Sequence, residues 1–362
     1  TYVENIDFGG RDITVMGIDG PHVTVIDGSG VASVVTIDSG EPASAMLIGF
    51  TITNGYASLG AGVSVQADAT LRNLIVTENE ARGAGGSGGG IAARNGSPTI
   101  EDVVLGGNVA DSNGGGLHMS NCDGAVLRNV LLSDNFGVQG GGAHITGSDT
   151  TAENLIVVGN NGGWVGGGIY ATDGSLTLTN ATIVGNGAPY GGGLAYGGGA
   201  VPVLTNVTIS ENMAGANGGG VFTDWNLLPL DTFSYVNVWN NSPDDYYVPV
   251  VDPTGANGNI SVDPQHLDLT DPDPQLWDVH LAVGSALVDA GDPSSVDPDG
   301  SVSDIGAYGG LGAGDWDLDA DAYDEWWQPG PYDPFSYTAD GWDCDDADAA
   351  IAVRTATPAA AT

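Results

Sequence analysis

The chain has 362 residues, of which 60 are Gly, and its 46 acidic residues against 6 basic ones give a net charge of −40 at pH 7. This balance excludes nucleic acid and anionic membrane surfaces as partners, because both need cationic patches on the protein. A disulfide scaffold is excluded because the chain has only 2 Cys. No apolar run approaches the ~18 residues of a membrane span, so we expect no membrane insertion.

Taken from the N-terminus, residues 3–27 and 34–54 form two weakly marked repeats, and from residue 62 the repeat is regular. A Gly-rich step followed by an apolar residue recurs every 25–28 residues. Its last Gly is Gly62, Gly90, Gly116, Gly142, Gly168, Gly193 and Gly220. A central Asn or Asp keeps the same spacing at Asn73, Asp102, Asn129, Asn154, Asn180 and Asn206, and a closing Asn at Asn79, Asn108, Asn135, Asn160, Asn186 and Asn212.

Within each repeat, apolar and polar residues alternate with the period of a β-strand, as in Leu-Thr-Leu-Thr-Asn-Ala-Thr-Ile-Val-Gly-Asn at 176–186. The pattern predicts two short strands joined by a corner at the central Asn, and a third strand after the Gly step. Three strands and three corners in about 26 residues make one coil of a parallel β-solenoid. The sequence therefore predicts an all-β fold of about nine coils.

The first and third residues after each Gly step are expected to stack inside the solenoid. These are Val63, Ile91, Leu117, Ala143, Ile169, Leu194 and Val221, and then Val65, Ala93, Met119, Ile145, Ala171, Tyr196 and Thr223. Corner Asn side chains are expected to hydrogen-bond from coil to coil as a ladder. The residues before the central Asn, Arg72, Glu101, Arg128 and Glu153, predict a column of salt bridges on adjacent coils.

Four domains follow from these patterns. Residues 1–265 are the β-solenoid, and residues 266–312, rich in Asp and Pro, are its non-repetitive C-terminal cap. Residues 313–352 are an acidic metal-binding region, and residues 353–362 are a Thr/Pro/Ala linker.

This arrangement resembles the right-handed parallel β-helix proteins of the pectin-lyase-like superfamily, in particular secreted bacterial β-helix-repeat proteins. The most specific match is Gly-Ser-Ala-Leu-Val-Asp-Ala-Gly-Asp at 284–292, followed by Asp-Ile-Gly-Ala-Tyr at 304–308. The resemblance implies a right-handed solenoid, which periodicity alone does not give. We interpret the chain as a processed piece of a secreted protein, extracellular or at the bacterial cell surface.

The acidic region carries carboxylates at every second residue. They are Asp315, Asp317, Asp319 and Asp321 at its start, and Asp343, Asp345, Asp346 and Asp348 at its end. Such carboxylates can converge on one hard cation, because Ca²⁺ takes about 6–8 oxygen ligands. The pattern also resembles an Asp-x-Asp-x-Asp…Asp-Cys-Asp-Asp metal-binding motif of secreted bacterial proteins. We predict Ca²⁺ as the cofactor, and the alternative is a solvated acidic linker.

A second candidate calcium site is formed by Asp297, Asp299 and Asp304 in Asp-Pro-Asp-Gly-Ser-Val-Ser-Asp. The alternative is a turn in which these Asp side chains hydrogen-bond to the backbone.

One column of residues is a candidate ligand-binding surface. His118 and His144 each lie two residues after a Gly step and are expected to point outward one coil apart, with Tyr170 and Phe222 continuing the column. Such a column can stack sugar rings, and a His pair can ligate a transition metal, although no third ligand stands in the same register. The alternative is an ordinary solvent-facing row of side chains.

Three functions fit these features. The first is a non-enzymatic, calcium-binding extracellular structural protein that assembles head to tail with copies of itself into filaments. The second is a carbohydrate-binding or adhesive module for an extracellular polysaccharide, and the third a polysaccharide lyase or hydrolase. A uronate lyase needs a cluster of cations, whereas this chain has no Lys and only six Arg. We therefore predict no enzyme and no catalytic residues.

Overall fold

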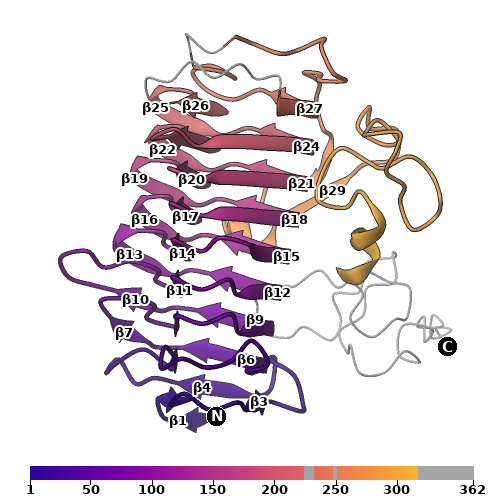
Figure 1. Ribbon diagram of the computed structural model, residues 1–362. Coiled ribbons are helices and arrows are strands. Elements are labelled where there is room, and N and C mark those ends of the chain that lie inside the picture. The colour runs from indigo at the N-terminus through magenta and orange to yellow at the C-terminus, as the bar shows by residue number, and fades with distance from the viewer. Residues whose placement is uncertain (224–231, 248–250, 317–362) are drawn as a thin grey trace, which may run out of the picture.

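The computed structural model describes residues 1–223, 232–247 and 251–316. These residues form a parallel β-solenoid in which each turn of the chain lies beside the previous one, as Figure 1 shows. Each coil passes through three sheets, named A, B and C. Within the described ranges, no helix is long and apolar enough to cross a membrane.

Sheet B holds the strands that follow the Gly steps. They are β2 (Ile6–Asp7), β5 (Val35–Ile37), β8 (Val63–Val65), β11 (Ile91–Arg94), β14 (Leu117–Ser120), β17 (Ala143–Thr146), β20 (Ile169–Thr172), β23 (Leu194–Gly197) and β26 (Val221–Thr223). Each is parallel to its neighbour and in register with it, so that Leu117 pairs with Ala143. The nine strands of this sheet agree with the predicted number of coils.

Sheet A follows sheet B in each coil and holds the longest strands. They are β1 (Tyr2–Val3), β3 (Thr14–Met16), β4 (Val25–Asp27), β6 (Met46–Thr53), β9 (Thr70–Thr77), β12 (Thr99–Gly106), β15 (Ala125–Ser133), β18 (Asp149–Val158), β21 (Ser175–Val184), β24 (Val201–Ser210) and β27 (Phe233–Trp239). Sheet C completes the coil. Its strands are β7 (Tyr56–Ala57), β10 (Glu80–Ala81), β13 (Val109–Asn113), β16 (Phe136–Gln139), β19 (Asn161–Val165), β22 (Gly187–Tyr190) and β25 (Met213–Asn217).

The central Asn or Asp lies within a strand rather than between two strands, which differs from the prediction. The two runs on either side of it form one strand of sheet A, bent where this residue adopts a left-handed φ of 49–55°. Asn and Asp tolerate this conformation better than other residues with a side chain. The third strand of each coil is therefore the short one after the closing Asn, in sheet C.

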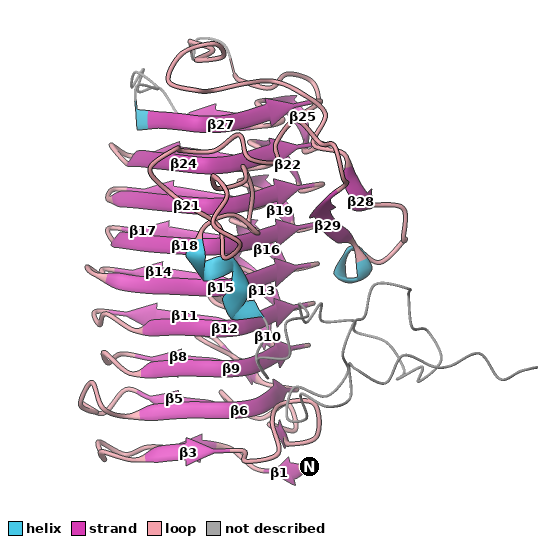
Figure 2. Ribbon diagram, turned by 90° about the vertical axis from the view of Figure 1, so that its right-hand side faces the viewer, coloured by secondary structure: helices cyan, strands magenta, loops and turns pink. Residues whose placement is uncertain are grey.

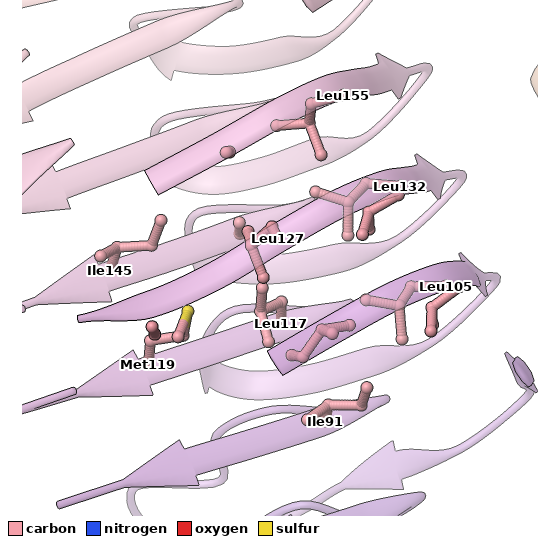
Figure 3. Close-up of a cluster of buried hydrophobic side chains, with 14 of the residues drawn as sticks. Ile91, Leu105, Leu117, Met119, Leu127, Leu132, Ile145 and Leu155 are labelled. Atoms are coloured by element: carbon pink, nitrogen blue, oxygen red, sulfur yellow. The ribbon is translucent and has the colours of Figure 1, made fainter. Parts of the chain in front are cut away.

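The predicted core is confirmed. All fourteen positions named above are at most 3% exposed. Figure 3 shows side chains from sheets A and B, such as Leu117, Met119 and Leu127, meeting inside the coils. Burying a side chain of this size contributes about 1.5–3 kcal/mol, so the stacked interior stabilises the solenoid along its whole length.

The closing Asn residues form a buried ladder, whereas the sequence predicts such a ladder at the central Asn of each coil. Each Nδ2 donates to Oδ1 of the Asn one coil further on, at 2.9–3.1 Å. The ladder continues from Asn79 to Asn241, beyond the last repeat found in the sequence. It satisfies main-chain carbonyls at the corner as well, as where Asn160 Nδ2 donates to the oxygen of Leu132 at 2.8 Å.

The C-terminal segment, residues 266–316, contains β28 (His266–Asp268), η2 (Pro274–Leu276), β29 (Asp278–Leu281) and η3 (Leu311–Trp316). It lies along the outer face of sheet A, where Figure 2 shows η3 in front of β15 and β18. The segment includes residues 266–312, which the sequence assigns to a non-repetitive C-terminal cap. A row of apolar side chains that sheet A directs outward holds it in this place, because Leu131, Ile156 and Val184 pack with Val279 and Ala307 of the segment.

Candidate functional site

The predicted outward column is only partly available to a ligand. His118 and His144 do point away from the solenoid interior, but their side chains are buried, at 3% and 5% exposure. Their rings stack with centroids 5.3 Å apart and their Nδ1 atoms at 3.3 Å, and His144 stacks in turn on Tyr170 at 5.2 Å. Tyr170 is itself buried against Val165 and Ala195. These side chains point outward as expected, but the alternative interpretation, a solvent-facing row, is wrong for these three residues.

Burial also keeps the two histidines uncharged at neutral pH. Loss of hydration, together with the smaller effect of the nearby Arg94 guanidinium, lowers the pKa of His118 to about 4. The pKa of His144 is lowered to about 3, mainly by burial and in second place by the electrostatic effect of the neighbouring His118. Both rings therefore serve as packed, neutral groups between the coils.

Two of the arginines have the structural role that the sequence predicts. Arg72 Nε lies 3.7 Å from Glu101 and 3.1 Å from Asp102, and Arg128 Nε lies 3.8 Å from Glu153. The strand register places these side chains directly opposite one another on adjacent coils. The side chains of both arginines are about half exposed, at 51% and 52%, so each pair contributes little, about 0–1 kcal/mol.

The second candidate calcium site forms hydrogen-bonded turns. Asp297 accepts from the backbone N–H groups of Gly310 and Asp304, at 2.5 Å and 3.1 Å. Asp299 accepts from the N–H and hydroxyl of Ser301, and Asp304 from the N–H of Asp289 at 2.8 Å. In the part of the chain that the structure describes, no three His, Cys, Asp or Glu residues are grouped so as to hold a metal ion.

The main candidate calcium site lies almost entirely outside the described residues. Asp317, Asp319 and Asp321 belong to residues 317–362, as do Asp343, Asp345, Asp346 and Asp348. Only the backbone of Asp315 is described, within η3. Calcium binding by this region therefore stays a prediction.

A different surface, on sheet C, gathers exposed apolar side chains that the sequence analysis did not select. Trp164 of β19 is 55% exposed and Met213 of β25 is 63% exposed, and Tyr190 of β22 lies between their coils. Trp164 and Tyr190 meet edge to face, with ring centroids 5.1 Å apart. The ring of Tyr190 contacts that of Phe222, with centroids 5.6 Å apart, and the ring of Phe222 in turn contacts that of Tyr247.

Trp164, Tyr190 and Met213 border an open groove of about 540 Å³, which we call the sheet C groove. Its other lining residues are small or neutral: Asn161, Gly187, Ala188, Pro189, Gly215 and Ala216. In sheet C, Gly187 lies between Asn161 of one neighbouring strand and Met213 of the other. Because Gly has no side chain, it leaves a gap in this outward-facing row of residues. A sequence signal for this surface exists in Gly-Gly-Trp-Val and Gly-Ala-Pro-Tyr, the segments that directly precede two successive Gly steps.

The chain is similar to a solved structure and to a family model. A solved structure described as pectate lyase Pel9A has 15% sequence identity and a TM-score of 0.43, over 84% of this chain and 77% of that one. At this level the similarity supports no inference about activity. No significant match was found among curated proteins. The family model described as "Right handed beta helix region" matches residues 23–214, more than half of the chain. The chain therefore belongs to the right-handed β-helix family.

Proposed function

We propose that this protein is a non-enzymatic structural protein of the extracellular space or the bacterial cell surface, stabilised by Ca²⁺ in its acidic C-terminal region. The observation that carries the proposal is that the side chains most able to do chemistry are engaged in packing or in ion pairs. His118 and His144 are buried and neutral, and Arg72 and Arg128 pair with carboxylates. Side chains engaged in this way hold coils together rather than meet a substrate.

The charge of the chain supports the calcium part of the proposal. A net charge of −40 favours expansion of the folded chain through self-repulsion. Divalent cations bound to the folded state offset that repulsion and stabilise the fold by mass action. The Asp-x-Asp-x-Asp spacing supplies the oxygen ligands that Ca²⁺ prefers.

Head-to-tail assembly is the second part of the proposal, and the N-terminal end of the stack supports it. Among the residues that the structure describes, β1 pairs only with β4 and β2 only with β5, so each has one edge that no described strand pairs. Tyr2 and Val3 of β1 are 57% and 70% exposed, and Ile18 in a nearby loop is 85% exposed. An unpaired edge with apolar neighbours is a template for another chain, and a heterologous contact of this kind builds filaments.

Calorimetry and light scattering on metal-stripped protein test both parts. We expect heat on addition of Ca²⁺, a higher melting temperature, and a mass that grows with protein concentration. The matched control replaces Asp343, Asp345, Asp346 and Asp348 by Asn and should bind no Ca²⁺ at that site. Absence of heat in the unaltered protein contradicts calcium binding, and a monomeric mass at every concentration contradicts assembly.

The non-enzymatic part has its own test. Incubation with polygalacturonate and with alginate should release no unsaturated uronate product. Product that disappears on Arg94→Ala would contradict the proposal and favour a lyase, because no ion pair engages Arg94 among the described residues.

A further inference from the structure

We infer that the sheet C groove binds a neutral polysaccharide, a function beyond that of a scaffold. The groove presents two large apolar side chains, Trp164 and Met213, with more than half of their surface in water. Binding energy in protein sites concentrates in such aromatic anchors, and a contiguous exposed apolar patch commonly marks a binding surface. Its volume of about 540 Å³ lies within the range of small-ligand sites.

The absence of charge in the groove lining favours a neutral ligand. None of the residues that line the groove is charged, although the chain carries 46 acidic residues. A cationic partner would gain more from the acidic surface elsewhere on the molecule, and an anionic chain such as a uronan would be repelled by the net charge of −40. The groove therefore offers its interactions to a ligand without charge.

The groove also suits the shape of a sugar. One face of a pyranose ring consists of C–H groups that pack on an aromatic ring, while its hydroxyl groups point sideways toward polar partners. Trp164 and Tyr190 supply two ring surfaces at an interplanar angle of 63°, and the exposed Asn161 supplies an amide at the edge of the groove. An apolar wall with a few polar groups is the usual composition of a site for an uncharged small molecule.

A polymer fits better than a single sugar, because the apolar surface continues along the stack. On β16, Phe136 and Val138 are 39% and 37% exposed, and β16 pairs with β19 in sheet C. Figure 1 shows β16, β19, β22 and β25 one above another. Neighbouring strands lie about 4.8 Å apart, so an extended chain along the stack meets a new coil every few ångströms.

Isothermal titration calorimetry tests the inference with cellohexaose, xylohexaose, mannohexaose and chitohexaose as probes, and with hexagalacturonate as the charged comparison. Two variants alter the groove in opposite ways: Trp164→Ala removes a wall, and Gly187→Val fills the floor. A Cβ at Gly187 meets only the carbonyl oxygen of Met213, at 3.9 Å, so a side chain can start there without a clash at its first atom. The control is Tyr56→Ala, which removes an exposed Tyr from β7, at the other end of sheet C.

We expect at least one neutral hexasaccharide to bind, and both groove variants to weaken its binding about tenfold or more, which corresponds to about 1.4 kcal/mol. Tyr56→Ala should leave the affinity unchanged, and hexagalacturonate should not bind. The inference is overturned if no neutral probe binds, or if both groove variants bind as the unaltered protein does. Self-association that both variants abolish, without glycan binding, would assign the groove to a second copy of the chain instead. Each titration is run with and without Ca²⁺, so that failure of this site is distinguished from failure of the calcium proposal.

Discussion

The solenoid and the C-terminal segment are held by different kinds of contact. In the solenoid the main contacts recur one coil further on, as in the Asn ladder from Asn79 to Asn241. In the C-terminal segment the contacts with the solenoid are made individually, such as that of Trp277 with Gly185. A repeated contact leaves a period in the sequence, whereas an individual contact leaves none. The two regions therefore differ in how much of their structure a sequence reveals.

The central Asn residues show both kinds of contact at one repeat position. In the six coils from Asn73 to Asn206, this residue gives sheet A the same left-handed bend. The hydrogen-bond partner of its side chain, however, depends on which segment covers the outer face of sheet A at that coil. Asn129 Nδ2 donates to Asp102 Oδ1 at 3.0 Å within the solenoid, whereas Asn154 Nδ2 donates to the carbonyl oxygens of Ala307 and Gly309, at 2.6 Å and 3.0 Å. The backbone role is thus set by the repeat and the side-chain role by the covering segment.

The largest difference between the regions should appear when one Asn is removed from each. Asn160→Ala deletes a rung of the ladder, leaving the amide groups of Asn135 and the carbonyl of Leu132 buried without their partner. An unsatisfied buried group costs about 1–3 kcal/mol, so we expect a loss of about 3 kcal/mol or more of unfolding free energy. Asn154→Ala should cost less, about 1–2 kcal/mol, and should mainly loosen the C-terminal segment.

Urea denaturation followed by circular dichroism measures the total effect, and hydrogen exchange locates it. Faster exchange confined to residues 266–316 is expected for Asn154→Ala, and faster exchange in several neighbouring coils for Asn160→Ala. Equal losses with the same exchange pattern would remove the distinction between the two regions.

Acid should act with opposite signs on the two buried histidines of the solenoid and on Asp304 of the C-terminal segment. The pKa of His118 and of His144 falls to about 4 and about 3 in the folded chain, from 6.5 when unfolded, chiefly through burial. Between pH 6.5 and about 4 the unfolded chain therefore binds protons that the folded chain does not, so stability is lost as the pH falls through this window. For His118 this loss is on the order of 3 kcal/mol, at about 1.4 kcal/mol per pH unit.

Asp304 of the C-terminal segment behaves in the reverse way. Burial raises its pKa to about 6, helped by the carboxylates of Asp297, Asp289 and Asp299. Between pH 6 and 3.8 the folded chain binds the extra proton, so acid relieves a cost there. We expect His144→Phe, which keeps a ring in the stack, to reduce the loss of melting temperature between pH 7 and pH 4. Asp304→Asn should raise the melting temperature at pH 7 and change it less at pH 4, and an unchanged pH profile in both variants would contradict these assignments.

How much the sequence predicts follows from this division. The Gly steps and alternating runs correctly predict the coils, the inward positions and the salt bridges of Arg72 and Arg128. They do not predict that the outward His118 and His144 are covered. A period of two distinguishes the faces of a strand, but it does not show what packs against the outer face.

A weaker signal for the covering of sheet A was present in the sequence. Residues 130–132 read Val-Leu-Leu and residues 155–158 read Leu-Ile-Val-Val, without the polar residues that a solvent-facing side requires. Such continuous apolar runs are typical of strands buried on both faces. They indicate that something covers sheet A, but not that residues 266–316 do so. The sheet C groove was missed for a related reason, because the space between Asn161 and Met213 arises from a Gly whose effect depends on its neighbours.

The smallest expected effect concerns glycines that receive the C-terminal segment. Gly185 has a φ of +66° and lies directly under the ring of Trp277, whose own indole N–H donates to the carbonyl of Asp271 at 2.8 Å. Gly185→Ala places a methyl group into that ring and strains the left-handed backbone, at a cost of about 1–2 kcal/mol. Gly163→Ala is the matched control, because its φ is ordinary and an added Cβ meets its nearest neighbour at 3.4 Å. Because the solenoid does not depend on Trp277, we expect Gly185→Ala to speed proteolysis of residues 266–316 while the circular-dichroism spectrum of the strands stays unchanged. If Gly185→Ala instead unfolds the whole chain in one step, the C-terminal segment and the solenoid are one cooperative unit. The two regions would then differ in their sequence patterns but would share one stability.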